Sequence, residues 1–327
     1  MSERSAHTDT GAAGPYGSPY HVPVLWKAVV EGLVTDPAGC YVDATIGGGG
    51  HTAALLDALA PEGRVIGIDR DPEALEAVRR RLSDAIEAGR LQLVQGNFAD
   101  LEAILDRLGV AQIDGLLLDL GVSSHQLDEA LRGFSFQAEG PLDMRMDPTS
   151  PGPTAAQLLE RWSEYELAEV LRRYGEEPRA RKLARAICRA RPIRTTAELA
   201  EVVRREVPPK EATKTLARVF QALRIAVNDE LQALERALEA ATRRVRPGGR
   251  LAVLSYHSLE DRRVKRFLRY GNLKGEPVRD FYGRLIAPWR PLTGRAIRPS
   301  DDEVAANPRA RSARLRIAER VAETENA

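Results

Sequence analysis

The fold is indicated most clearly by two neighbouring segments, YVDATIGGGGHT (41–52) and RVIGID (64–69). Each contains a short β-prone run, and the first run leads through four glycines into an Ala/Leu-rich, helix-prone stretch at 52–59. Two further apolar runs, at 91–94 and 113–120, alternate with helical segments in the same way. Continuous apolar strands between helices are typical of a parallel sheet covered on both faces. The sequence therefore predicts an α/β fold.

A fifth strand is predicted at 250–256, after a long segment that we interpret as helical. Three Ser or Thr residues in that segment are followed at the third position by Glu or Gln, which is the capping-box pattern of a helix start. The pairs are Thr154 with Gln157, Ser163 with Glu166, and Thr195 with Glu198. An apolar stripe at 223–238 predicts one longer helix that begins at Phe220 and leads back to the sheet. The α/β fold thus contains a large helical insertion before its fifth strand.

The charge balance excludes a uniformly basic nucleic-acid-binding protein. The 327 residues include 48 Lys+Arg and 47 Asp+Glu, which gives a net charge of +1. The segment 172–205, however, holds eleven Lys+Arg and four Asp+Glu, a local net charge of +7. This segment is either an ordinary solvated helical surface or a binding surface for RNA phosphates, in which case binding would depend strongly on salt.

Cysteine content and hydropathy indicate a cytoplasmic protein that does not enter a membrane. Two cysteines, Cys40 and Cys188, are too few for a disulfide framework or a cysteine-based zinc site. Apolar runs stay shorter than the ~18 residues needed to span a bilayer. Residues 1–20 are rich in Ser, Gly, Thr and Ala and lack an apolar signal core, so we predict a disordered leader there.

The glycine turn and its acidic neighbours predict a site for a nucleoside-containing cofactor. Glycines after the first strand let the backbone approach a ligand, and Asp69, at the end of the second strand, can accept hydrogen bonds from a ribose diol. Dinucleotide and S-adenosylmethionine enzymes share this arrangement, and a turn that serves packing alone is a further alternative. Three details favour S-adenosylmethionine. Thr52 occupies the position of the third dinucleotide-motif glycine, Asp43 can anchor a cationic amine, and a Pro-Gly-Gly turn at 247–249 precedes the fifth strand.

Nine blocks of the sequence, in order, resemble the bacterial 16S rRNA cytosine-N4 methyltransferase family of the RsmH or MraW type. They are HVPVL (21–25), DATxGxGGH (43–51), GIDRDP (67–72), DGxLxDLGVSS (114–124), RGFSF (132–136), GPLDMRMD (140–147), FQALRI (220–225), HSLEDR (257–262) and NPRARS (307–312). The resemblance implies a Rossmann-like class I S-adenosylmethionine-dependent methyltransferase core formed by 21–131 and 220–327, with a helical insert at 132–219. It also implies methyl transfer to the N4 amine of a cytosine in 16S rRNA of the small ribosomal subunit.

The same resemblance implies a set of donor-binding residues. We expect no metal ion, because Asp143 and Asp147, which could contact a metal or RNA, lack further clear ligands and fit a salt-bridged hinge with Arg145. The implied donor-binding residues are Gly49, Gly50, His51, Asp69, Phe98, Asp119 and Gln126. The chain departs from the family pattern at His125, where proline is usual, at Tyr256, where phenylalanine is usual, and at Thr52, which is commonly serine. The basic stretch at 213–218 is altered as well.

The segment after the fourth strand bears on the chemical step. Many amino-methyltransferases hold the target amine there with a D/N-P-P-Y motif, whereas this chain has DLGV at 119–122, without the prolines or the aromatic residue. We hypothesise that Asp119, or loop carbonyls near it, orients the amine, and that positioning supplies most of the acceleration. His51 and His257 each fit either a general base or a structural role.

Functions of other classes remain as alternatives. One is a ribosome-assembly factor that binds the small subunit and uses the donor site as a sensor. Another is methylation of protein, DNA or a small molecule, with the insert as the specificity module. A homodimer formed through exposed apolar helix faces is compatible with the sequence.

Overall fold

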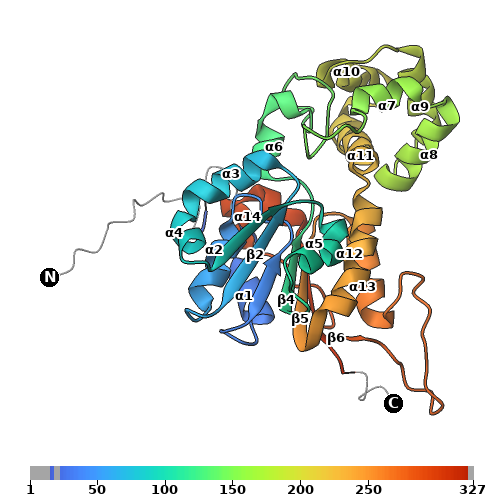
Figure 1. The fold of residues 1–327 in the computed structure, drawn as a ribbon. Helices are drawn as coiled ribbons and strands as arrows, with labels where there is room; N and C mark the ends of the chain where they lie inside the picture. The colour runs from blue at the N-terminus through green and yellow to red at the C-terminus, as the bar shows by residue number, and fades with distance from the viewer. Residues whose placement is uncertain (1–14, 18–22, 323–327) are drawn as a thin grey trace.

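The computed structural model describes residues 15–17 and 23–322, so most of the predicted leader lies outside the described residues. Seven strands form one sheet in the order β3-β2-β1-β4-β5-β7-β6 (Figure 1). They are β1 (Cys40–Asp43), β2 (Arg64–Asp69), β3 (Leu91–Gln95), β4 (Ile113–Asp119), β5 (Val245–Ser255), β6 (Trp289–Pro291) and β7 (Arg314–Arg320). Strands β1 to β5 are parallel, whereas β7 is antiparallel to β5 and β6. The predicted α/β fold is confirmed.

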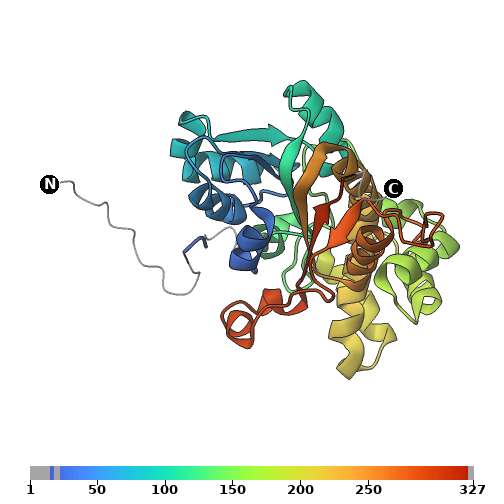
Figure 2. The ribbon, with the colours of Figure 1, turned by 90° about the horizontal axis from the view of Figure 1, so that it is seen from below.

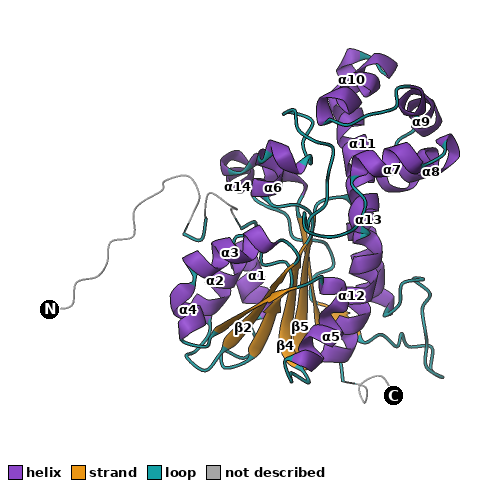
Figure 3. Ribbon diagram, turned by 45° about the horizontal axis from the view of Figure 1, so that its top comes forward, coloured by secondary structure: helices purple, strands orange, loops and turns teal. Residues whose placement is uncertain are grey.

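Helices cover both faces of the sheet (Figures 2 and 3). One layer consists of α1 (Trp26–Leu33), α2 (Gly50–Ala58), α3 (Pro72–Arg81) and α4 (Ser83–Glu87), and the other of α5 (Leu101–Arg107), α12 (Glu230–Arg244) and α13 (Ser258–Tyr270). Successive strand residues enter different apolar clusters: Leu116 and Leu118 pack with α5, α12 and α13, and Leu117 packs with α1 to α3. Each strand face is therefore buried, which explains the continuous apolar runs in the sequence.

Strand β5 begins five residues earlier than predicted, at Val245. Val245 pairs with Ile113, and regular pairing resumes only where Arg250 meets Gly115, so the Pro-Gly-Gly turn bulges out of the ladder between them. Gly248 has a φ of 79°, a backbone conformation that favours glycine. Continuous pairing of β5 with β4 thus starts at Arg250, the residue predicted from the sequence. The earlier start of β5 reflects only the single pair Val245–Ile113, which precedes the bulge.

The segment between β4 and β5 is helical, as predicted, and much of it stands beyond the carboxyl edge of the sheet (Figure 1). Before α12 it contains α6 (Ser124–Asp128), η2 (Ala130–Arg132), α7 (Ala155–Arg161), α8 (Glu164–Gly175), α9 (Ala180–Arg189), α10 (Thr196–Glu206) and α11 (Pro209–Asn228). All three predicted capping boxes are formed, at the starts of α7, α8 and α10. The helices share an apolar cluster that extends from Phe134 to Leu223, separate from the two clusters of the sheet.

The helix predicted to run on from Phe220 is wrong in its extent. Helix α11 begins at Pro209 and ends at Asn228, and Asp229, with a φ of 52°, separates it from α12. The apolar stripe continues across this break, but its residues before and after the break are buried in two different hydrophobic clusters. Leu223 packs within the insert cluster, and Leu234 packs against the sheet. The predicted domain boundary at 219/220 falls inside α11, and the domain limits stay a prediction.

Helix α14 (Asp301–Ala306) and the turn η3 (Pro308–Ser312) precede β7. Among the described residues, no helix combines the length and apolarity needed to cross a membrane. The predicted homodimer stays a prediction.

Candidate active site

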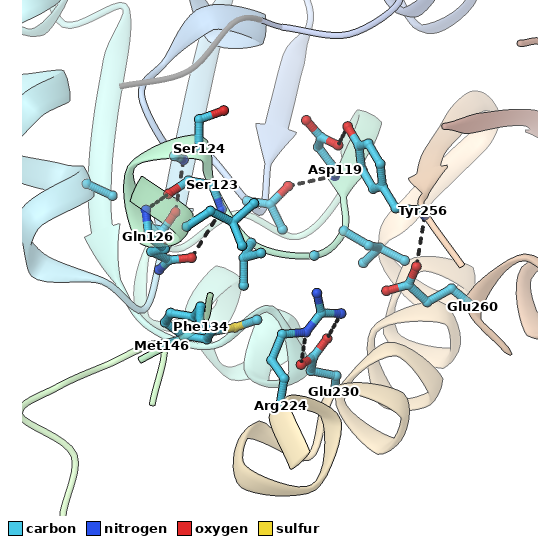
Figure 4. Close-up of a pocket in the computed structure, with 18 of the residues that line it drawn as sticks. Asp119, Ser123, Ser124, Gln126, Phe134, Met146, Arg224, Glu230, Tyr256 and Glu260 are labelled. Atoms are coloured by element: carbon cyan, nitrogen blue, oxygen red, sulfur yellow. Dashed lines mark hydrogen bonds and ion pairs between the residues drawn. The ribbon is translucent and has the colours of Figure 1, made fainter. Parts of the chain in front are cut away.

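A cavity of about 500 Å³ opens at the carboxyl ends of the parallel strands (Figure 4). This volume lies within the usual range for small-molecule sites. Its wall includes residues of the sheet core, such as Asp69 and Asp119, and residues of the insert, such as Phe134 and Met146. The cavity is therefore lined both by the ends of the sheet strands and by the segment between β4 and β5.

The glycine turn forms one wall of the cavity. Gly47, Gly50 and His51 line it, while Gly49 lies behind them, where an added Cβ would come within 3.1 Å of a Val78 methyl group. Gly49 has a φ of 74° and is the residue directly before α2, and its N–H donates to the carbonyl of Ile46 at 2.8 Å. Of the predicted donor-binding glycines, Gly50 reaches the cavity and Gly49 shapes the turn.

Asp69 ends β2 at the cavity wall, as predicted. One carboxylate oxygen accepts the N–H of Gly47 at 2.9 Å, and the other accepts the N–H of Asp71 at 2.9 Å. Burial raises the pKa of Asp69 to about 6 and outweighs these hydrogen bonds, which lower it. Each carboxylate oxygen has capacity for a second hydrogen bond, so Asp69 can also accept bonds from two ligand hydroxyl groups.

Phe98 and Gln126 also line the cavity, but they act differently. Phe98 begins η1 (Phe98–Asp100), just after β3, and offers an aromatic surface. The amide of Gln126 is engaged by the protein, because its oxygen accepts the N–H of Ser123 at 3.1 Å and its nitrogen donates to Asp71 at 2.8 Å. Gln126 therefore holds the loop after β4 in place, and its polar atoms already have protein partners.

Asp119 ends β4, is fixed by two hydrogen bonds and has a histidine beside its carboxylate. Its backbone N–H donates to the hydroxyl of Thr45 at 2.6 Å, and the hydroxyl of Tyr256 donates to its Oδ1 at 2.9 Å. Nε2 of the buried His51 lies 3.4 Å from Oδ2. Burial, together with the charge of Asp119, raises the pKa of Tyr256 well above its ordinary value, so the tyrosine stays a hydrogen-bond donor. Its contact with Asp119 was not foreseen from the sequence, although Tyr256 already stood out as a departure from the family pattern.

Asp43 does not take the predicted position toward a ligand amine. Its side chain is 1% exposed, lies behind the cavity wall, and accepts the hydroxyl of Thr52 at 2.7 Å. Burial raises the pKa of Asp43, while the nearby His51 and the Thr52 hydrogen bond oppose this rise. Thr52, which occupies the position of the third dinucleotide-motif glycine, therefore stabilises the buried side of the turn through its hydrogen bond to Asp43.

A second polar group, made of Arg224, Glu230, His257 and Glu260, also lines the cavity. Figure 4 shows Arg224 and Glu230 pointing toward one another, with Glu260 near Tyr256. Arg224 binds both oxygens of Glu230, at 2.8 and 2.7 Å. His257 caps α13 and its Nε2 lies 3.1 Å from Glu260, which favours the structural role for this histidine. The FQALRI and HSLEDR blocks contained three of these residues, but only the fold brings them together.

Ligand atoms of Glu230, His257 and Glu260 lie within 4.8 Å of one another, close enough to hold a metal ion. Arg224 already provides a cation for Glu230, and Glu260 accepts the backbone N–H groups of Tyr256 and His257. Both carboxylates therefore already have hydrogen-bond partners within the protein, and their positions are explained without a metal ion. The expectation of no metal ion stays a prediction.

The start of the insert is fixed to the sheet core by a buried ion pair. Arg132 donates to Asp71 at 2.9 Å, and to the carbonyl of Met146 at 2.8 Å. The side chains of Arg132 and Asp71 are 7% and 1% exposed. This pair connects the cofactor side of the cavity, through α3, with the insert side.

Comparisons with known proteins agree with this geometry. The MraW methylase family matches residues 18–321. Ribosomal RNA small subunit methyltransferase H of Symbiobacterium thermophilum is 48% identical over 308 residues, which cover 91% of this chain and 95% of that protein. The protein of the same name from Halorhodospira halophila is 51% identical over 314 residues, 92% of this chain and 94% of that protein. The chain therefore belongs to the MraW methylase family and is an S-adenosylmethionine-dependent methyltransferase.

Proposed function

We propose that this enzyme transfers a methyl group from S-adenosylmethionine to the N4 amine of a cytosine in 16S rRNA, within the small ribosomal subunit and in the cytoplasm. Its relatives bear the name ribosomal RNA small subunit methyltransferase H. The observation that carries the proposal is the Asp119 carboxylate, hydrogen-bonded by Tyr256 and adjacent to His51 in a cavity lined by both the sheet core and the insert.

The residues around the glycine turn suit the methyl donor. Asp69 accepts the ribose hydroxyl groups, Phe98 offers a ring surface to the adenine, and the backbone of Gly50 and His51 borders the methionine portion. S-adenosylmethionine supplies an electrophilic methyl group on a sulfonium centre. Gln126 and Gly49 support this site indirectly, since the first holds the loop after β4 and the second shapes the turn.

The exocyclic amine of cytosine is a weak nucleophile because its lone pair is delocalised into the ring. In the proposed step Asp119 accepts a hydrogen bond from one N–H of the amine and turns the nitrogen toward the methyl group. A C–N bond forms as the S–C bond breaks, the electron pair of the S–C bond stays with the sulfur of the departing S-adenosylhomocysteine, and the nitrogen then loses a proton to water. The hydrogen bond from Tyr256 keeps the carboxylate in place during the step, with His51 packed beside it, so that positioning provides the acceleration.

The insert, taken as 132–219, serves RNA recognition in this proposal. Phe136 lies edge-to-face with Phe220, 5.4 Å between ring centroids, and both line the cavity. Aromatic side chains of this kind can receive a base that has left its stack. On the outer surface, Arg181 and Arg189 of α9 are exposed and lack an ion-pair partner among the described residues. They are available for phosphate contacts.

The test is transfer of label from methyl-labelled S-adenosylmethionine to purified small ribosomal subunits, followed by digestion of the RNA to nucleosides. Label in N4-methylcytidine supports the proposal. Label in protein or another nucleoside contradicts it, and tight subunit binding without transfer favours the assembly-factor alternative.

Asp119→Ala should abolish transfer, with the exposed Asp106→Ala as its matched control. Survival of turnover with only a raised KM would remove Asp119 from the proposed step. Arg181→Gln with Arg189→Gln should weaken RNA binding and reduce its salt dependence.

A further inference from the structure

Between α13 and β6 lies a projecting segment, residues 272–288, which we call the arm (Figure 1, the orange loop at the lower right). Its ends are anchored in the core: Leu273 packs against the sheet cluster, and the buried Trp289, just beyond the arm, donates to the hydroxyl of Thr242 at 2.8 Å. The arm thus leaves the protein from two fixed points.

The outer half of the arm is an ordered hairpin. The N–H of Ile286 donates to the carbonyl of Val278 at 2.8 Å, and the N–H of Asp280 donates to the carbonyl of Arg284 at 2.9 Å. The Asp280 carboxylate accepts the N–H of Arg284 at 2.8 Å, and Arg279 donates to the carbonyl of Gly283 at 2.6 Å. These bonds hold the turn at the tip in one conformation.

The tip presents two aromatic rings to the surroundings. Phe281 is 97% exposed and Tyr282 is 79% exposed. The rings lie edge-to-face, with centroids 5.6 Å apart, and the guanidinium group of Arg284 lies 5.7 Å from the Tyr282 centroid. A large apolar side chain that is almost fully exposed on an ordered turn indicates a contact surface for a partner.

The charge around these rings is positive. The arm, residues 272–288, contains three Lys+Arg and two Asp+Glu, a local net charge of +1. In the described part of the chain, Lys274, Arg279 and Arg284 have no carboxylate partner in an ion pair, and the Asp280 carboxylate is bound to the backbone. Exposed aromatic rings interleaved with free cations match single-stranded RNA, which offers base faces for stacking and phosphates for the cations.

We propose that the arm is a second RNA-binding element, which stacks an unpaired base of the substrate RNA on Phe281 and Tyr282. Helix α13 separates it from the cavity, and its 13 residues correspond to roughly 20 Å. The arm therefore contacts a different part of the RNA from the target cytosine. The proposal rests on the proposed function, because both take RNA of the small subunit as the substrate.

The test compares three double variants of the full-length protein. Phe281→Ala with Tyr282→Ala removes both rings, Phe281→Leu with Tyr282→Leu keeps apolar bulk, and Phe281→Tyr with Tyr282→Phe exchanges the rings. Stacking of one base supports a change of about 5- to 150-fold. We expect the Ala and Leu variants to raise KM for small subunits by a factor in this range at unchanged kcat, and the exchange variant to behave as wild type. All should share the wild-type affinity for S-adenosylmethionine and the wild-type denaturation midpoint.

A wild-type KM for the Ala variant would overturn the proposal. Wild-type behaviour of the Leu variant would overturn it too, because apolar bulk would then suffice, as it does at a protein contact. Direct binding to protein-free small-subunit rRNA keeps the two proposals distinguishable. If wild-type protein transfers no label, the proposed function fails, but the RNA-binding role of the arm is still tested by the affinity of the Ala variant for the RNA. Equal RNA affinity of the Ala variant and wild type would refute the RNA-binding role of the arm.

Discussion

Replacement of Tyr256 by Phe removes one hydroxyl group from the proposed catalytic position and leaves the ring in place. That hydroxyl donates to Asp119 at 2.9 Å. Hydrogen bonds to charged groups contribute about 1.5–3 kcal/mol. Because Asp119 keeps the neighbouring His51 and its backbone bond to Thr45, we expect a loss at the lower end, about 1.5 kcal/mol, which is about tenfold in rate.

The kinetics should place this loss in a particular step. If Asp119 orients the amine, Tyr256→Phe lowers kcat by about tenfold and leaves the affinity for S-adenosylmethionine unchanged. Steady-state kinetics with small subunits, together with calorimetric titration of the donor, measure the two quantities separately. Loss confined to donor affinity would refute the orienting role and leave Asp119 as a donor-binding residue.

Tyr41→Phe is the matched control. Tyr41 is fully buried in β1, and its hydroxyl accepts the N–H groups of Thr35 and Asp36 at 3.0 Å each and donates to the carbonyl of Asp36 at 2.9 Å. Its removal should lower the free energy of unfolding without changing kcat. Equal loss of kcat in both variants would show that the effect of Tyr256→Phe is a general consequence of destabilisation.

Further predictions concern pH, stability and the glycine turn. The pKa of Asp69 is raised from 3.8 to about 6, so the folded protein holds this proton longer, and the free energy of unfolding of the unliganded protein should fall as pH rises between these values. Asp69→Asn should remove this fall in pH-dependent urea denaturation, and in wild type the donor affinity should rise through about pH 6 as the acceptor ionises. Arg132→Ala leaves the buried Asp71 carboxylate without its cationic partner, so urea denaturation should show a loss of about 3–5 kcal/mol, against under about 1 kcal/mol for the exposed Arg79→Ala. Gly49→Ala places a side chain in the left-handed region and should cost about 1–2 kcal/mol in the same assay, and wild-type stability would contradict the assigned turn conformation.

Local patterns were sufficient for most elements of the fold. The bounds of β2 match the predicted run at 64–69, and three helices start at the predicted capping boxes. A capping box depends on residues three positions apart, and a buried strand depends on its own apolar run, so both are visible in a short window of sequence.

The break between α11 and α12 shows where local patterns fail. The apolar stripe continues through Asp229, so periodicity alone predicts one helix. The buried Asn228 side chain binds the backbone at Met144 and Met146, at 2.7 and 2.8 Å, and Arg70 donates to the Asn228 carbonyl at 3.3 Å. These contacts come from segments more than 80 residues away, and they stabilise a helix end that the sequence pattern does not indicate.

Sequence patterns were sufficient to predict the fold class, the glycine turn, and the positions of Asp69 and Asp119 at one edge of the sheet. Parallel strands end at the same edge, so acids at their carboxyl ends must lie near one another. Which groups these acids contact could be learned only from the packed structure. Tyr256 reaches Asp119 across 137 residues, while Asp43, another aspartate close to the turn, is satisfied internally by Thr52. The reason is that a buried polar group must find its partner among whatever side chains the packed fold brings within about 3 Å.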